Sequence, residues 1–242
     1  MYEDIASKFL EHFLFISDAM SFNSGGADGA SDIATLWNDE HGFYFDAITW
    51  GPDSYMQVPV RSLVGLIPLY ATLTLEPATL KKLPGFKKRM DWFIEHRSDV
   101  ANRNIANMRL GGRSDRKLLA LASRDRLRRI LERMLAENEF LSDYGIRSLS
   151  LAHKESPWSM NVNGEDFSVS YWPGDSHSPM FGGNSNWRGP IWLATTFLLI
   201  ESLQRFYQVR FCSTLPLAST NAARSTMATR SRSSARLAAA SR

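Results

Sequence analysis

The stretch Phe181-Gly-Gly-Asn-Ser-Asn-Trp-Arg-Gly-Pro-Ile-Trp192 has small, flexible residues near its start and two tryptophans in its second half. The two glycines and the asparagine near its start tolerate positive φ, so the backbone there can turn tightly or approach a ligand closely. Pro190 has a fixed φ and no N–H, which suits the first turn of a helix. Residues 191–206 are apolar on nearly every side, as in a buried helix. The sequence therefore predicts a shaped loop that leads into a core helix.

The aromatic and charged residues at this junction favour a sugar-binding site. A tryptophan ring can cover the C–H face of a pyranose, and a guanidinium group can hold hydroxyls or a catalytic carboxylate. The alternative is that both tryptophans belong to the core and that the arginine is a buried ion-pair partner. Composition alone favours this alternative, because large aromatic side chains are mostly buried. The residues concerned are Asn186, Trp187, Arg188 and Trp192.

Three further stretches accompany this motif: Leu36-Trp-Asn-Asp-Glu-His-Gly-Phe-Tyr-Phe-Asp46, Val60-Arg-Ser-Leu-Val-Gly-Leu-Ile-Pro-Leu69 and Glu139-Phe-Leu-Ser-Asp-Tyr-Gly-Ile-Arg-Ser-Leu-Ser150. With the motif itself, and in this order, they resemble glycoside hydrolase family 63, the mannosyl-oligosaccharide glucosidase-like proteins, and above all its bacterial and fungal members. The tryptophan–arginine motif alone is only suggestive, since related toroidal hydrolases have variants of it. Four ordered matches, extending to about Gln208, are a strong signal.

The resemblance implies an (α/α)6 toroid, a ring of six helical hairpins of which this chain supplies a part. It also implies inverting hydrolysis of an α-glucosidic bond in an oligosaccharide or glucoside, without a cofactor. In that reaction one carboxylic acid protonates the leaving oxygen, and a carboxylate activates water on the opposite face. The family's acid is an aspartate that we place before Met1. Its base is a glutamate that we place beyond the end of the resemblance. We therefore expect a chain that is inactive on its own.

Three more residues are candidates for the wall of a sugar site. Tyr171 and Trp172 lead into the opening stretch, and Asp46 ends an aromatic run. A buried carboxylate at Asp46 needs a partner, which is either a structural one such as Arg61 or a sugar hydroxyl. Asp39 and Glu40 are adjacent and therefore point apart, as expected for exposed turn residues. The competing possibility is that the family's acid lies within the chain, at Asp39, Glu40, Asp46 or Asp175.

The apolar periodicity predicts a mainly-α fold, a partial (α/α)6 toroid with short β-hairpins in the loops. In the first helix the expected apolar stripe is Ile5, Phe9, Phe13, Ile16 and Met20. Arginines alternate with acidic residues along the fourth helix, which indicates a solvated face rather than a polyanion site. Helices are expected over residues 2–20, 60–75, 85–97, 115–137 and 191–206, and short strands near 43–48 and 156–171.

The composition changes at residue 209, where Ser, Ala, Thr and Arg begin to dominate and acidic residues vanish. We expect residues 1–208 to form part of a glycosidase catalytic domain. Residues 209–242 are expected to be a disordered basic tail or, as we favour, an out-of-frame end of a truncated reading frame. The formal net charge is +3, and the tail holds six arginines, so the rest has a net charge of −3. The basic pI therefore does not indicate nucleic-acid binding.

Other classes of function receive little support from the sequence. Cys212 is the single cysteine, and His177 has no second ligand at metal spacing, so we expect neither a disulfide framework nor a metal site. We find no transmembrane segment and no signal peptide, which favours the cytoplasm. The alternative functions are a non-catalytic carbohydrate-binding or helical scaffold fragment and a basic-tail interaction protein. The tail lacks the interleaved aromatics of a single-strand binder.

Overall fold

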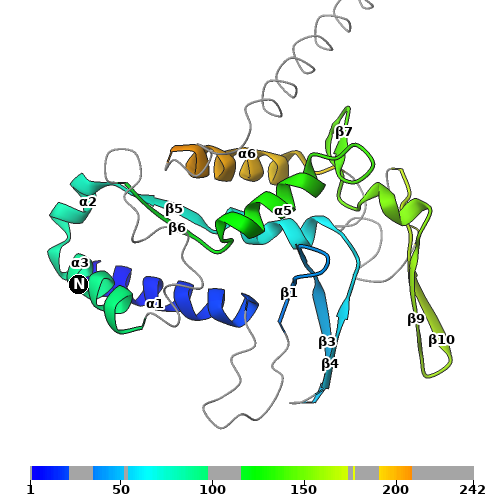
Figure 1. The fold of residues 1–242 in the computed structure, drawn as a ribbon, viewed down its shortest axis with the longest axis horizontal. Coiled ribbons are helices and arrows are strands. Elements are labelled where there is room, and N and C mark those ends of the chain that lie inside the picture. The colour runs from blue at the N-terminus through cyan, green and yellow to red at the C-terminus, as the bar shows by residue number, and fades with distance from the viewer. Residues whose placement is uncertain are drawn as a thin grey trace, which may run out of the picture. The chain divides into compact units, whose positions relative to one another are not determined.

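The structure of the chain is a computed structural model, which describes residues 2–21, 35–51, 54–97, 116–173, 177 and 191–208 (Figure 1). All of these lie in one unit, Met1–Val209. The predicted tail at 209–242 lies outside the described residues. The helical elements are α1 (Tyr2–Ser21), the 3-10 helix η1 (Leu63–Tyr70), α2 (Pro77–Lys82), α3 (Pro84–His96), α5 (Arg124–Met134), the 3-10 helix η3 (Leu151–Lys154) and α6 (Leu193–Gln208).

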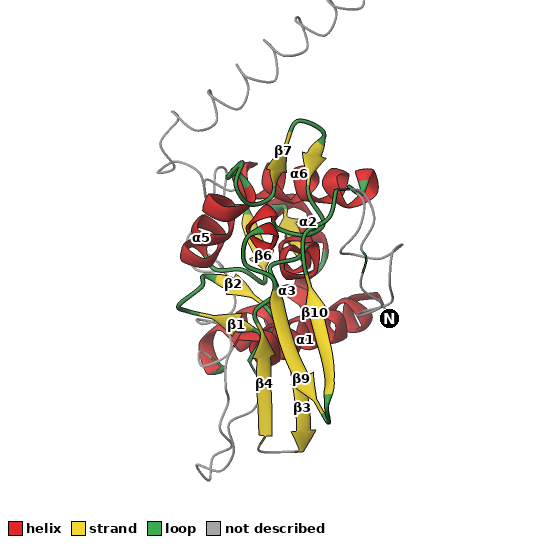
Figure 2. Cartoon of the chain, turned by 90° about the vertical axis from the view of Figure 1, so that its right-hand side faces the viewer, coloured by secondary structure: helices red, strands yellow, loops and turns green. Residues whose placement is uncertain are grey.

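Antiparallel pairs of short strands form five small sheets in the described part of the chain (Figure 2). In four of them the paired strands lie close together in sequence, whereas the segment that contains α2 and α3 separates β5 from β6. The pairs are β1 (Trp37–Asn38) with β2 (Phe43–Tyr44), β3 (Asp46–Gly51) with β4 (Ser54–Val58), β5 (Thr72–Leu75) with β6 (Lys117–Ala120), β7 (Leu141–Ser142) with β8 (Gly145–Ile146), and β9 (Trp158–Val162) with β10 (Glu165–Val169).

The prediction of a mainly-α partial toroid is wrong. About half of the described residues are helical and about a quarter are in strands. Two predicted helices contribute to the difference. Residues 60–75 form η1, which contains Pro68, and then the strand β5. Residues 117–120 form β6, which pairs with β5 from Thr72↔Ala120 to Leu75↔Lys117, so α5 begins only at Arg124. Long-range strand pairing therefore overrides local helical periodicity at both places.

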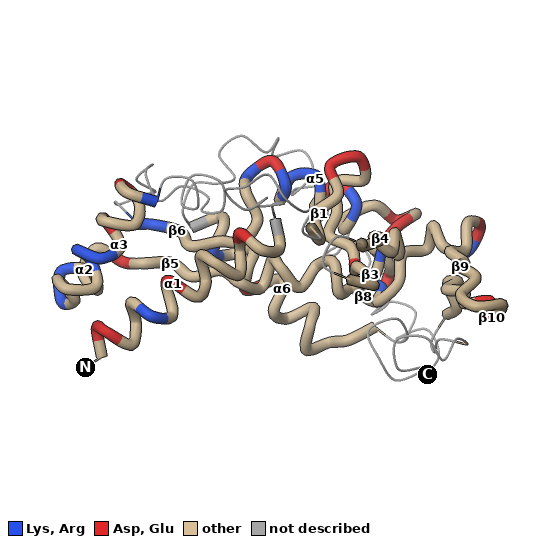
Figure 3. The backbone as a smooth tube through the Cα atoms, turned by 90° about the horizontal axis from the view of Figure 1, so that it is seen from below, with Lys and Arg blue, Asp and Glu red and all other residues tan. Residues whose placement is uncertain are grey.

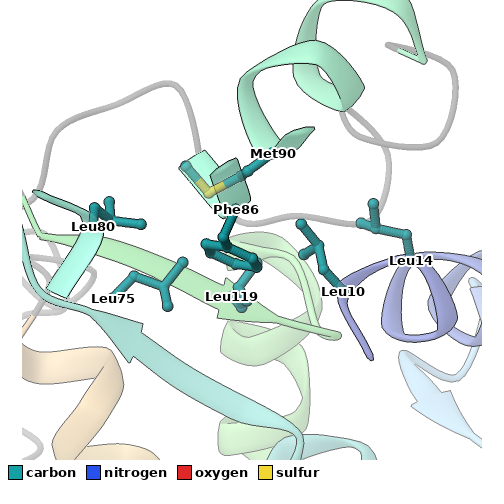
Figure 4. Packing of buried hydrophobic residues seen from close by; sticks show 7 residues of the cluster. All are labelled: Leu10, Leu14, Leu75, Leu80, Phe86, Met90 and Leu119. Atoms are coloured by element: carbon teal, nitrogen blue, oxygen red, sulfur yellow. The ribbon is translucent and has the colours of Figure 1, made fainter. Parts of the chain in front are cut away.

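One core cluster packs α1, α2 and α3 against the β5–β6 ribbon (Figure 4). Leu75 and Leu119 come from the two strands, Leu10 from α1, and Phe86 and Met90 from α3. In α3, Phe86 and Met90 are buried, and Phe93 is partly buried against the same cluster. In α1 the buried residues include Leu10 and Leu14, while the predicted stripe residues Ile5, Phe9 and Ile16 are 47%, 69% and 55% exposed. The predicted helix is confirmed and its predicted inner face is wrong.

The core beside η1 joins three of the matched segments. Phe43 is fully buried and stacks on Phe140, with ring centroids 5.6 Å apart. Gly65 lies against the Phe43 ring, because a Cβ at this glycine would stand 2.2 Å from Phe43 Cε1 and 2.4 Å from the Tyr44 carbonyl oxygen. Gly42 has a positive φ of +62° in the turn between β1 and β2. The segments 36–46, 60–69 and 139–150 therefore fold as one packed unit.

Helix α6 contacts η1, β5 and β8. Its inner side contains the buried Leu199 and Phe206, and Arg205 donates from Nη1 to the carbonyl oxygen of Thr72 in β5 (2.5 Å). Phe197 and Tyr207 on its other side are more than half exposed. The predicted helix is confirmed, but it is not buried on all sides in the described structure.

Candidate functional site

A buried carboxylate, Glu139, lies where the segments 60–69 and 139–150 meet. Its Oε2 accepts a hydrogen bond from Arg61 Nε (2.9 Å) and another from the Ser150 hydroxyl. Its Oε1 accepts from Arg133 Nη1 (3.0 Å). The Glu139 side chain is 10% exposed, so its charge has lost most of its water. Two guanidinium groups and a hydroxyl compensate for that loss, because charge-assisted hydrogen bonds are the strong ones.

Backbone hydrogen bonds fix the same two segments against each other. Ser150 N donates to the carbonyl oxygen of Arg61 (2.9 Å), and Leu63 N donates to that of Ser148 (2.7 Å). Leu151 N in turn donates to the carbonyl oxygen of Glu139 (2.9 Å). These contacts satisfy backbone groups that neither segment could satisfy alone. The Arg61–Glu139 ion pair is therefore part of a preorganised junction.

His153 extends this junction from η3. It is 5% exposed, and its Nε2 accepts a hydrogen bond from the backbone N–H of Arg61 (2.9 Å). Its Nδ1 lies 3.2 Å from the carbonyl oxygen of Ser156. Burial lowers the pKa of His153, and the nearby Arg61 charge acts in the same direction, while the Ser156 carbonyl and Glu139 oppose it. A neutral ring with its proton on Nδ1 satisfies both contacts.

The arginines of α5 do not form a uniformly solvated face, contrary to the prediction. Arg124 and Arg128 are exposed, but Arg126 turns inward. The Arg126 guanidinium carbon lies 4.7 Å from the centroid of the buried Trp37 ring, and its Nη1 donates to the Tyr44 hydroxyl (3.4 Å). This cation–π contact ties α5 to the β1–β2 pair.

Two further arginines of α5 hold the loop between β1 and β2. In Figure 3 both basic and acidic positions lie along the backbone around α5. Arg129 Nη2 donates to the carbonyl oxygen of Glu40 (3.2 Å), and Arg133 Nε donates to that of His41 (2.7 Å). Because Arg133 also pairs with Glu139, it joins this loop to the buried carboxylate. One face of α5 therefore organises the 36–46 segment.

Two of the predicted wall residues, Asp46 and Tyr171, lie beside one core cluster. Asp46 is half-buried in β3, opposite Val58 of β4. Tyr171 packs against the cluster that contains Val58 and Val169, and its backbone N–H donates to the carbonyl oxygen of His153 (3.2 Å). The ion-pair partner of Arg61 is Glu139 rather than Asp46, which the sequence suggested.

Trp172 follows Tyr171, which packs against this cluster, and is 45% exposed. Its Nε1 donates to the Ser170 hydroxyl (2.8 Å). One face of its ring stacks on His177, with centroids 4.2 Å apart and planes at 9°. A partly exposed indole held in this way can present an apolar ring face to a sugar.

Trp192 lies at the start of α6, away from Trp172 in the sequence. Its carbonyl oxygen accepts from Thr195 Oγ1 (2.9 Å) and from the Thr196 backbone N–H (3.1 Å). The preceding Ile191 lies against the β7–β8 turn, since a Cβ at Gly145 would stand 3.3 Å from its Cγ2. The entry to α6 is therefore beside the 139–150 segment. Asn186, Trp187 and Arg188 lie outside the described residues, as does Asp175.

Sequence reasoning did not single out Glu139, Arg133 or His153. The available signal was that Arg61, predicted to be paired, needed an acidic partner, and that Glu139 opens another matched segment. Periodicity could not reveal the role of Arg133, because its partners lie in other segments. In the described ranges, no three His, Cys, Asp or Glu side chains are grouped so as to hold a metal ion. None of the helices described is both long and apolar enough to span a bilayer.

Comparison with known proteins shows which proteins the chain resembles. Residues 116–221 match the model of the glycosyl hydrolase family 63 C-terminal domain. The chain is 56% identical over 217 residues to "Uncharacterized protein YMR196W" of Saccharomyces cerevisiae (strain ATCC 204508 / S288c). That match covers 86% of this chain and 19% of the yeast protein, so the chain spans about a fifth of the relative's length. No solved structure matches the chain.

The family match relates residues 116–221 of the chain to the glycosyl hydrolases. More particularly, the chain contains sequence of the glycosyl hydrolase family 63 C-terminal domain. The family that the four sequence motifs indicated is thereby confirmed. The matched range includes Glu139, His153, the Tyr171–Trp172 segment and the entry to α6.

Proposed function

We propose that this chain is part of an inverting α-glucosidase that acts on oligosaccharides or glucosides. In this proposal the chain forms part of the wall of the sugar site and does not contain the two catalytic carboxyl groups. The family match supports a carbohydrate substrate. The observation that carries the rest is the bonding of Glu139, the one acidic residue that is buried in the described part of the chain. Its two oxygens are engaged by Arg61, Arg133 and Ser150. A carboxylate bonded in this way stabilises the fold rather than transferring protons.

An inverting glycosidase needs two carboxyl groups that face each other across the scissile bond, roughly 6.5–9.5 Å apart. Both family carboxylates lie outside the matched motifs of this chain in our assignment. The proposed role of the chain is therefore to shape the sugar site. Its lining residues are Asn186, Trp187, Arg188 and Trp192 at the entry to α6, with Asp46, Tyr171 and Trp172.

A second candidate function is carbohydrate binding without hydrolysis. The exposed Trp172 ring beside a packed cluster favours it, since stacking needs no acid or base. Titration with maltose, measured by isothermal titration calorimetry, tests the shared sugar-binding claim. Trp172→Ala should abolish the response, whereas Trp50→Ala, which removes another exposed tryptophan (59%), should not. Equal binding by the wild-type chain and Trp172→Ala would contradict the proposed wall.

A further inference from the structure

A continuous series of hydrogen bonds links the buried Glu139 to the segment that contains Tyr171. Glu139 Oε2 accepts from Arg61 Nε (2.9 Å), and the backbone N–H of Arg61 donates to His153 Nε2 (2.9 Å). The carbonyl oxygen of His153 then accepts from the backbone N–H of Tyr171 (3.2 Å). His153 therefore contacts Arg61 of the ion pair and Tyr171, the first residue of the proposed wall segment.

The His153 contacts require one protonation state of its ring. Nε2 must be unprotonated to accept from Arg61, and Nδ1 must hold the proton to donate to the Ser156 carbonyl. A protonated imidazolium cannot accept the Arg61 N–H, which would leave a buried donor unsatisfied. Proton uptake by this ring therefore breaks the series at its centre.

From this geometry we infer that His153 is a positioning residue, whose neutral imidazole couples the Tyr171–Trp172 segment to the Arg61–Glu139 ion pair. The expected effect on sugar binding rests on the proposed function, because it requires the Tyr171–Trp172 segment to form the wall of the sugar site. The charged and titratable groups that face His153 are Arg61, Glu139 and Tyr171, from the segments after β4, α5 and β10. Lys154 and Glu155 on its own element are exposed.

Two substitutions in the full chain of 242 residues separate coupling from simple packing. In His153→Gln, the side-chain carbonyl can accept from Arg61 and the amide can donate to Ser156 at every pH. His153→Leu has a similar size and can do neither. The readouts are hydrogen exchange at the Tyr171 amide, corrected for the intrinsic exchange rate, and the NMR signal of the Trp172 indole N–H, assigned with Trp172→Phe.

We expect the wild-type chain and His153→Gln to protect the Tyr171 amide equally at pH 7.5. On acidification to pH 5, the wild-type chain should lose protection by about fivefold or more, because protonation of the ring removes the buried hydrogen bond from the Arg61 N–H to His153 Nε2. His153→Gln should keep its protection. His153→Leu should protect the Tyr171 amide less than wild type at both pH values, because residue 153 loses the two ring contacts that hold its carbonyl oxygen in place. The inference is overturned if His153→Gln follows the wild-type pH response or if His153→Leu retains the protection. If His153→Leu does not fold, the comparison of wild type with His153→Gln decides.

Maltose titration of the same samples distinguishes this inference from the proposed function. With the wall held by His153, the leucine variant should bind maltose about tenfold more weakly and the glutamine variant within about twofold of wild type. Equal maltose binding by wild type and His153→Leu would overturn the positioning role. A wild-type chain that shows the pH-dependent coupling but no response to maltose would support the coupling and contradict the sugar site alone.

Discussion

Arg61 and Glu139 are 78 residues apart in the chain, and their side chains meet at 2.9 Å between Nε and Oε2. The side chains are 19% and 10% exposed, so both charges are largely out of water. Removing one partner of such a pair leaves the other charge buried and uncompensated. This relationship makes Glu139 the residue on which the packing of two matched segments depends.

We predict that Glu139→Ala destabilises the chain by about 3 kcal/mol or more, the usual cost of breaking a buried ion pair. Arg61 and Arg133 would both lose a charge-assisted partner. The measurement is urea unfolding followed by circular dichroism. Glu132→Ala is the matched control, because its pair with Arg128 is 62% and 61% exposed and should be worth less than about 1 kcal/mol. Equal midpoints for the two variants would contradict the structural role of Glu139.

Gly65→Ala should destabilise the chain by about 2 kcal/mol or more, because overpacking forces neighbouring groups to shift. The new Cβ would stand 2.2 Å from Phe43 Cε1 and 2.4 Å from the Tyr44 carbonyl oxygen, and the backbone oxygen cannot simply rotate away. Gly51→Ala is the control, since nothing lies within 4 Å of a Cβ there. Thermal unfolding of both variants tests the prediction, and a Gly65→Ala midpoint equal to that of Gly51→Ala would refute it.

Arg126→Ala should cost about 1 kcal/mol, since its guanidinium carbon lies 4.7 Å from the centroid of the buried Trp37 ring. Arg124→Ala removes the same charge from an exposed position of α5 and should leave the stability almost unchanged. Chemical unfolding of the two variants provides the comparison. If both midpoints equal that of the wild-type chain, the contact between α5 and Trp37 contributes nothing.

Acidification should lower the stability of the chain through His153. The pKa of this histidine in the folded chain is lowered from its usual 6.5, chiefly by burial. Between the folded and unfolded pKa values the unfolded chain binds more protons, so stability rises with pH through this window and falls as pH drops below about 6.5. The free energy of unfolding, measured between pH 5 and 8, should therefore change less in His153→Gln than in the wild-type chain. Identical pH slopes would show that His153 is not responsible.

The elements that the sequence predicted correctly are those whose pattern is local. The helices α1, α3 and α6 have apolar residues at helical spacing. The pairing of Thr72 with Ala120 joins residues far apart in the chain, so the leucines near them appeared helical. The inner face of α1 was misjudged for a related reason. Periodicity places apolar residues on a stripe but does not say which side meets a neighbour.

The candidate site likewise combines local features that the sequence shows with contacts between distant segments that it does not show. Residue type, and the place before the glycine-rich motif, led to the proposal that Tyr171 and Trp172 line the site. The partners of Arg61 and Arg133 could not be found from spacing, because Glu139 approaches them from another segment. Sequence resemblance supplied the family, and only the folded arrangement showed which carboxylate is structural.

The central claim is that this chain shapes a glucosidase site without holding its two catalytic carboxylates. The most direct test is to measure glucose release from α-glucosides by the purified chain, beside a family member that contains both carboxylates. Losing one acid–base partner typically removes a factor of roughly 10²–10⁴, so turnover should fall by at least that much. Asp39→Asn and Glu40→Gln should leave any residual rate unchanged. Turnover within about tenfold of the complete enzyme, lost on either substitution, would show that a catalytic carboxylate lies inside this chain.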